Sequence, residues 1–146
     1  MGFILDTNLY VAADRDQPAA DALTEFYSRH LPQTYLHAVV VQEMLAGAIS
    51  PLRMRRLHAS LIEPFERRQR LVVPDFATWK RSGEIIARLA DRRLITPGVF
   101  RRSFLHDVML AGSCRQFGHT LVTSNQRDFE LIRKVERFEF VPPFPD

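Results

Sequence analysis

Short apolar runs alternate with longer segments of helical spacing along the whole chain, and this alternation restricts the possible fold more than any other feature. Runs of this length, bounded by turn-forming or polar residues, are typical of buried strands. When strands alternate with helices, the strands usually pair in parallel and the helices cover both faces of the sheet. The pattern therefore predicts an α/β fold, a three-layer α/β/α sandwich with a mainly parallel central sheet. Strands are predicted over Gly2–Leu5, Tyr35–Val41, Leu71–Val73, Thr120–Thr123 and Phe138–Val141.

Helix signals lie between these runs. Apolar residues recur at helical spacing over Gln17–His30, where Pro18 is compatible with the first turn. The second predicted strand is expected to break into a helix near Val39–Val41, because the residues that follow are good helix formers. The segment Leu52–Arg68 is helical in pattern and strongly basic, and Pro64 is expected to interrupt or end it.

The second half of the chain predicts two more long helices and a short one. The helix over Phe104–Phe117 should end at Gly118, because glycine readily adopts the left-handed conformation that a C-terminal cap needs. Asn125 is expected to open the short helix, and the helix over Ala77–Arg92 is amphipathic. The expected buried side of that amphipathic helix consists of Trp79, Ile85, Ile86 and Leu89.

The length of 146 residues corresponds to one domain, so residues 1–146 are expected to form a single unit with its own core. The one cysteine, Cys114, cannot form an intramolecular disulfide. No basic segment followed by an apolar stretch indicates a signal peptide, and no apolar run approaches the roughly 18 residues of a membrane span. A cytoplasmic protein without membrane contact is therefore expected.

The positive charges of the chain are almost all arginine. The formal net charge is +3, and Lys80 and Lys134 are the two lysines. Arginine suits phosphate groups because its planar guanidinium donates two parallel hydrogen bonds. This composition permits a nucleic acid partner but does not demonstrate one, because a solvated arginine-rich surface explains it equally well.

Acidic residues follow two of the predicted strands. Asp6 ends the first strand, and Asp128 lies just beyond Thr120–Thr123. Ligands of parallel sheets bind outside the carboxyl ends of the strands, so the two acids are expected at one edge if these strands are neighbours. Two further acids, Glu43 and Asp107, lie among apolar residues with no Lys or Arg three or four positions later. A local ion pair therefore does not account for them.

Four carboxylates gathered at one site would suit a hard cation. Mg²⁺ and Mn²⁺ prefer oxygen ligands, and such an ion lowers the pKa of a bound water and stabilises charge on a phosphoryl oxygen. Each acid also has a structural explanation. Asp6 can cap the following helix, and Asn125 with Asp128 resembles a capping box. Glu43 can be a surface residue, and Asp107 can favour the positive end of its helix, but one shared site explains all four acids together.

Several motifs occur in an order that resembles one known family. They are FILDTNLYV at the start, VVVQEMLAGA about a third of the way along, HDVMLAGSCRQFGHTLVTSNQRDF near the end, and the short closing strand. The combination of DTN, QE, D-x-x-L-A and T-x-N-x-x-D-F resembles a PIN-domain ribonuclease, more narrowly a VapC-type toxin of a bacterial type II toxin–antitoxin system. The resemblance extends over essentially the whole chain.

The resemblance implies a metal-dependent endoribonuclease that hydrolyses RNA phosphodiesters with a metal-activated water held by four carboxylates. Asp6 and Asp107 match the principal ligands of Mg²⁺, for which Mn²⁺ can substitute. Glu43 and Asp128 match the acids that complete the pocket, either by holding a second metal or by orienting the water. A homodimer and a cognate antitoxin protein that blocks the site are also implied. The residues that match the polar lining of the pocket are Asn8, Thr123 and Asn125.

Three features lie outside this signature. His106 can contact the substrate, or it can cap a helix or face solvent. The segment Asp91–Ser103 is longer than the family pattern predicts, and its arginines can meet RNA or the antitoxin. A strip of arginines is either a solvated helix face or a surface that faces RNA. The strip comprises Arg53, Arg55, Arg56, Arg67, Arg68 and Arg70.

Other classes with an early aspartate fit less well. A phosphatase of the haloacid-dehalogenase type needs a second Asp two residues after the first, where this chain has Asn8, and it needs a catalytic lysine. A phospho-receiver domain needs an early acidic pair and a late lysine, and a flap-endonuclease-like nuclease is normally longer with more acids. The remaining alternative is a catalytically inactive PIN-like module that binds RNA or protein, and the four intact acids argue against it.

Overall fold

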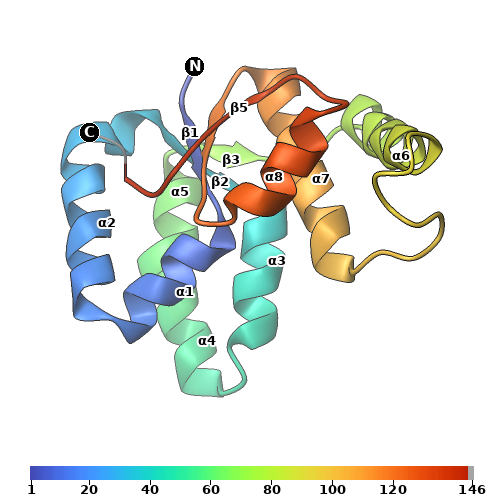
Figure 1. Ribbon diagram of the computed structural model, residues 1–146. Coiled ribbons are helices and arrows are strands. Elements are labelled where there is room, and N and C mark those ends of the chain that lie inside the picture. Colours follow the sequence, from blue (N-terminus) through green and yellow to red (C-terminus); the bar gives the residue numbers. More distant parts are fainter. Residues whose placement is uncertain (145–146) are drawn as a thin grey trace.

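A sheet of five parallel strands forms the centre of the computed structural model, which describes residues 1–144 (Figure 1). Pro145 and Asp146, the last residues of the predicted domain, lie outside the described residues. The strand order is β3-β2-β1-β4-β5, with every neighbouring pair parallel. The predicted α/β class is confirmed. The strands are β1 (Phe3–Leu5), β2 (Thr34–His37), β3 (Leu71–Val72), β4 (Thr120–Val122) and β5 (Glu139–Val141).

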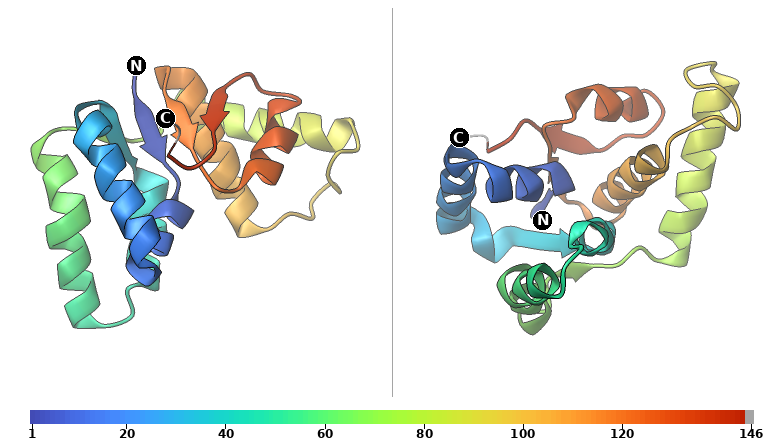
Figure 2. Two further views of the ribbon diagram at one scale, coloured as in Figure 1. Left: turned by 60° about the vertical axis from the view of Figure 1, so that its left-hand side comes forward. Right: turned by 90° about the horizontal axis from the view of Figure 1, so that it is seen from below.

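Helices connect the strands and lie on both sides of the sheet. Figure 2 shows α1 and α2 on one side and α6 and α7 on the other. In the part of the chain that the structure describes, none of the helices combines the length and the apolar character needed to cross a bilayer. The α-helices are α1 (Thr7–Arg15), α2 (Gln17–His30), α3 (Ala38–Gly47), α4 (Pro51–Leu57), α5 (Glu63–Arg67), α6 (Phe76–Asp91), α7 (Arg102–Phe117) and α8 (Gln126–Arg133), with a 3-10 turn η1 (Leu31–Gln33) and a π-helical segment η2 (His58–Ile62).

The ends of several helices agree with the sequence signals. The bounds of α2 are those predicted, and the Asp16 side chain caps it by accepting a 3.1 Å hydrogen bond from the Ala19 backbone N–H. α7 ends at Gly118, whose φ of 72° is the left-handed conformation expected of a C-terminal glycine cap. Pro64 interrupts the basic helix without ending it, because η2 precedes it and α5 continues to Arg67.

Two predictions are wrong. The strand predicted over Tyr35–Val41 ends at His37, and α3 begins one residue before the predicted break near Val39–Val41. The reason is that His37 Nδ1 accepts a 2.9 Å hydrogen bond from the Val39 backbone N–H and caps the helix. Trp79 was expected to be buried, but 61% of it is exposed. α6 packs closely on α7, and small residues such as Thr78 occupy this contact, so the bulky Trp79 lies outside it.

The strand pairing decides where the site lies. β1 pairs with β4 in a register that sets Leu5 opposite Val122, and the Asp6 backbone N–H donates a 2.9 Å hydrogen bond to the Val122 carbonyl. The chain segments after β1 and β4 therefore leave the sheet side by side at its carboxyl edge. α7 runs through the interior and is buried from Asp107 to Cys114. The position of α7 brings Asp107 toward the same region of the molecule.

Candidate active site

Asp6 lies at the carboxyl end of β1 and is 5% exposed. Its Oδ1 accepts a 2.8 Å hydrogen bond from the Thr7 backbone N–H, so the capping explanation of this residue is confirmed. Its Oδ2 accepts hydrogen bonds from the Thr123 hydroxyl at 2.8 Å and from the Asn8 side-chain amide at 3.1 Å. Burial raises the pKa of the Asp6 carboxyl, and the hydrogen bond from Thr123 opposes this shift. One carboxylate thus caps α1 and also joins the ends of two strands.

The Thr123 hydroxyl is the centre of the hydrogen bonds between these strand ends. It donates to Asp6, and it accepts from the Asn125 backbone N–H at 2.9 Å and from Asn8 Nδ2 at 3.3 Å. A hydroxyl has one donor and two acceptor positions, so all of them are used. The three residues that the sequence predicted as a polar lining are therefore brought together by the fold.

Asp107 enters the site from α7. The pKa of its carboxyl is raised to about 8, chiefly by burial and then by the negative charges of Asp6, Asp128 and Glu43, while Arg101 lowers it. Hydrogen bonds connect the four acids in pairs, because Thr7 bonds both Asp6 and Glu43, and Asn125 bonds both Asp107 and Asp128. We call these four residues the acidic cluster. Strong perturbation by burial together with specific charges is typical of functional sites.

Asn125 links two members of the acidic cluster. Its side-chain Nδ2 donates to Asp107 Oδ2 at 3.3 Å and to Asp128 Oδ2 at 3.0 Å. Its Oδ1 accepts a 3.4 Å hydrogen bond from the Asp128 backbone N–H, so Asn125 also caps α8. Half of the predicted capping box is present, because the backbone N–H of Asn125 bonds Thr123 instead of Asp128. Asp128 remains free to pair with Arg101, whose Nη2 lies 3.1 Å from Asp128 Oδ2.

Glu43 lies on α3, and 28% of its side chain is exposed. Its Oε1 accepts a 2.8 Å hydrogen bond from the Thr7 hydroxyl. Its Oε2 lies 3.5 Å from His106 Nδ1, a buried nitrogen that has no hydrogen-bond partner among the described residues. Of the explanations offered for His106, helix capping is wrong, because Arg101 holds the N-cap position of α7. The His106 side chain is 22% exposed and lies beside the acidic cluster.

Three contributions to the site have no signal in the sequence motifs. Thr7 was not singled out as a site residue, but its hydroxyl donates a hydrogen bond to Glu43, 36 positions later in the chain. Arg101 reaches Asp128 across 27 positions from a segment outside the family signature. His37 caps α3 and is joined by a 2.8 Å hydrogen bond to Ser113 on α7, so it ties together the helices that carry Glu43 and Asp107.

The acidic cluster fits a hard divalent cation held partly through water. Within residues 1–144, no group of three His, Cys, Asp or Glu side chains is placed to coordinate one ion directly. Mg²⁺ usually keeps several of its waters and binds proteins through one or two carboxylates, so direct contact with three side chains is not needed. Burial and then the negative charges of the other three acids raise the pKa of Asp107, and a bound cation would offset the repulsion between these charges. The donor set consists of oxygen atoms, which Mg²⁺ and Mn²⁺ prefer.

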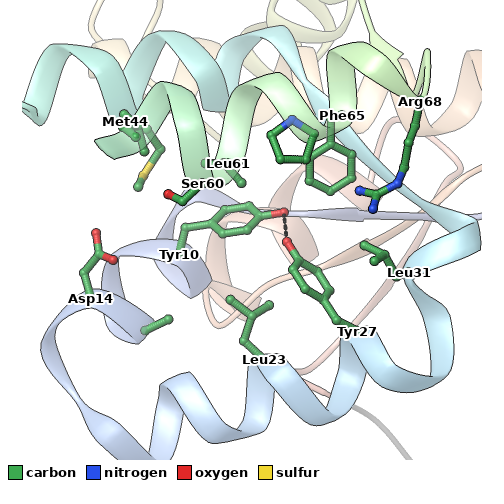
Figure 3. Close-up of a pocket in the computed structure, with 13 residues that line it drawn as sticks. Tyr10, Asp14, Leu23, Tyr27, Leu31, Met44, Ser60, Leu61, Phe65 and Arg68 are labelled. Carbon is green, nitrogen blue, oxygen red and sulfur yellow. Dashed lines mark hydrogen bonds between the residues drawn. The ribbon is translucent and has the colours of Figure 1, made fainter. Parts of the chain in front are cut away.

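A separate pocket of about 310 Å³ lies among α1, α2 and the α4–α5 segment (Figure 3). None of the acidic cluster lines it. Its central polar groups satisfy each other, because the Tyr27 hydroxyl donates a 3.0 Å hydrogen bond to the Tyr10 hydroxyl. Burial raises the pKa of Tyr27 to about 12, so both phenols stay protonated at neutral pH. The lining of this pocket is mostly apolar, and the pocket is separate from the acidic cluster.

The sequence profile of the PIN domain family matches residues 3–135, a range that contains the whole acidic cluster. The chain belongs to the PIN domain family. This PIN domain is 30% identical over 130 residues to the tRNA(fMet)-specific endonuclease VapC of Shigella flexneri. The alignment covers 89% of this chain and 91% of the relative. The predicted resemblance to VapC-type proteins is therefore confirmed.

Solved structures show the same fold for this PIN domain. A chain of FitAB bound to an IR36 DNA fragment superposes with a TM-score of 0.73 at 20% identity, over 99% of this chain and 96% of that chain. A chain of the DNA-bound VapBC from Salmonella typhimurium superposes with a TM-score of 0.72 at 22% identity, over 97% of this chain and 98% of that chain. At these identities the similarity shows the fold alone.

Proposed function

We propose that this PIN domain is a metal-dependent endoribonuclease, the toxic component of a type II toxin–antitoxin system, and that residues 1–146 act as a single cytoplasmic nuclease domain. The observation that carries the proposal is the position of Asp107. Its carboxyl lies close enough to Asp6, Glu43 and Asp128 for their negative charges to add to the effect of burial in raising its pKa. A fold that needed only structural stability would not gather four acids at the open edge of its sheet, because their repulsion has to be overcome.

Asp6 and Asp107 are proposed as the principal ligands of Mg²⁺ or Mn²⁺, with Glu43 and Asp128 completing the pocket. When bound, the ion supplies a water of lowered pKa and a positive charge for the phosphoryl oxygen. Asp6 is held rigidly by three hydrogen bonds, which fixes one ligand before the ion arrives. Glu43 is the most exposed of the four acids, and it is suited to orient the attacking water.

The relatives support an RNA substrate and a protein partner. The Shigella flexneri relative is named as an endonuclease specific for tRNA(fMet), so RNA is the substrate class that we propose for this chain. This chain shares its fold with one chain of VapBC and one chain of FitAB. Both names denote assemblies, which supports a cognate antitoxin. We further propose that the chain forms a homodimer.

RNA cleavage by the purified chain tests this proposal. Asp6→Asn and Asp107→Asn should each lower the rate of cleavage in Mg²⁺ at least about 100-fold, because each removes a charged ligand. Asp91→Asn is the matched control, since Asp91 is an exposed acid at the end of α6. If the wild-type chain cleaves no RNA in Mg²⁺ or Mn²⁺, and its induction is as harmless to cells as that of Asp6→Asn, the chain is an inactive binding module.

A further inference from the structure

An open cleft lies beside the acidic cluster, between α8 and the segment that joins α6 to α7. It has a volume of about 710 Å³. Leu94 and Arg101 line it from the joining segment, and Arg127, Leu131 and Lys134 line it from α8 and its C-terminal cap. We call this feature the α8 cleft. Arg101 belongs to the stretch that the family signature leaves unexplained.

The α8 cleft is continuous with the acidic cluster, because Asp128 belongs to both and Asn125 bonds two members of the cluster. Asp128 and Asn125 line the cleft, and Asn125 Nδ2 lies 3.3 Å from Asp107 Oδ2. A molecule that extends out of the cluster along α8 therefore enters the cleft at once. The pocket at Tyr10 and Tyr27 has no such connection, since it shares no lining residue with this cleft.

Three cationic and two acidic side chains line the α8 cleft. Arg101, Arg127 and Lys134 are exposed, and Asp128 belongs to the acidic cluster. Glu130 is the other acid on the lining. One Arg101 nitrogen donates to Asp128 at 3.1 Å, but 73% of the side chain is exposed, so the remaining donors of the guanidinium are open to a ligand.

We propose that the α8 cleft binds the RNA strand next to the scissile phosphodiester, with Arg101, Arg127 and Lys134 contacting backbone phosphates. This inference rests on the proposed endoribonuclease function and adds a path for the strand. Guanidinium and ammonium groups are the usual partners of phosphate, and several of them along one groove match a chain that carries one charge per nucleotide. Leu94 and Leu131 provide apolar surface for a ribose or a base.

Binding of a labelled single-stranded RNA of mixed sequence, followed by fluorescence anisotropy in EDTA, tests the proposal without cleavage. Arg127→Gln and Lys134→Gln should each weaken binding about 3- to 10-fold at low salt. Each should also reduce the slope of log Kd against log salt by about 0.7, the value for one lost phosphate contact with a single strand. In cleavage assays the same variants should raise KM and leave kcat nearly unchanged, because they act outside the acidic cluster.

Arg15→Gln is the matched control, because Arg15 is exposed at the end of α1 and is not among the residues that line the cleft. It should leave both the affinity and the salt slope as in wild type, and thermal melting should confirm that all variants are folded. The proposal is overturned if Arg127→Gln and Lys134→Gln bind RNA like wild type, or if wild type binds no RNA at low salt. Loss of affinity for a co-expressed antitoxin with unchanged RNA binding would make the cleft a protein interface instead.

The two proposals fail in different ways. If the endoribonuclease function is wrong, wild type cleaves nothing, but the effect of the cleft variants on RNA binding in EDTA can still be measured. If the proposal that the α8 cleft binds RNA is wrong, wild type cleaves RNA, and Arg127→Gln and Lys134→Gln have the same KM and the same salt slope as wild type.

Discussion

The hydroxyl of Thr123 lies 2.8 Å from Oδ2 of Asp6, a residue 117 positions earlier in the chain, and this hydrogen bond is buried. The contact exists because β4 pairs in parallel with β1, so both strands end at the same edge of the sheet. The bond connects the first acid of the cluster to the segment that leads through Asn125 into α8, which carries Asp128.

Replacing Thr123 by valine, which keeps the shape but removes the hydroxyl, should affect both folding and activity. The free energy of unfolding should fall by about 1–3 kcal/mol, because the buried Asp6 carboxylate loses a donor. RNA cleavage should fall about 10- to 100-fold, as is typical when a group that orients a metal ligand is lost. Urea denaturation and initial cleavage rates measure the two effects. Thr123→Ser retains the hydroxyl and should recover most of both, and equal stability of the Val and Ser variants would contradict the assigned role.

Replacing Asp107 by asparagine should stabilise the chain when divalent cations are chelated. The pKa of this carboxyl is raised from 3.8 to about 8, so the folded state binds more protons than the unfolded state between these values and loses stability as pH rises. Asparagine carries no charge and can still accept the hydrogen bond from Asn125. The free energy of unfolding in EDTA at neutral pH should rise by roughly 1–3 kcal/mol.

The effect of Mg²⁺ on thermal stability tests the same explanation in the opposite direction. It should raise the melting temperature of wild type by mass action, and it should have little effect on Asp107→Asn. If Asp107→Asn is less stable than wild type in EDTA, or if Mg²⁺ stabilises both proteins equally, then repulsion between Asp107 and the other three acids does not destabilise the chain.

His37 should make the chain less stable in mild acid. Burial lowers its pKa from 6.5 to about 4, so between these values the unfolded state takes up a proton that the folded state does not. The free energy of unfolding should therefore fall as pH decreases from 6.5 to about 4, by up to roughly 3 kcal/mol. Protonation of Nδ1 would also break the hydrogen bond with which His37 caps α3.

Chemical denaturation across this pH range, with wild type and His37→Gln in parallel, isolates the contribution of His37, since the other histidines are common to both. The variant should be less stable at neutral pH and should show a flatter pH dependence. Identical slopes in the two proteins would assign the acid sensitivity to other groups.

Arg81 and Glu136 form an ion pair that joins α6 to the turn after α8. Both carboxylate oxygens of Glu136 accept hydrogen bonds from the Arg81 guanidinium, and the Glu136 side chain is 2% exposed. Arg81→Met should lower the free energy of unfolding by about 2–4 kcal/mol, because it leaves a buried carboxylate without its partner. The double variant Arg81→Met, Glu136→Met should recover part of the loss. Urea denaturation of wild type, Arg81→Met, Glu136→Met and the double variant completes the cycle. Additive losses would mean that the two side chains are not coupled.

The parts of the fold that follow from local chemistry could be predicted from the sequence. The bounds of α2 and the cap at Gly118 depend on residues a few positions apart, so spacing was sufficient to place them. The end of β2 and the exposure of Trp79 were predicted wrongly. The first depends on a histidine acting as a helix cap, and the second on how closely α6 approaches α7.

The sequence by itself determined the identity of the four acids, their places at the ends of strands and on helices, and the family to which they belong. The tertiary structure alone decided that the charges of the other three acids act on Asp107. It also decided that Thr7 donates a hydrogen bond to Glu43 and that Arg101 donates one to Asp128. The physical reason is that charge repulsion, desolvation and hydrogen bonding depend on distance in space. Residues far apart in the chain acquire those distances only when parallel strands bring them to one edge of the sheet.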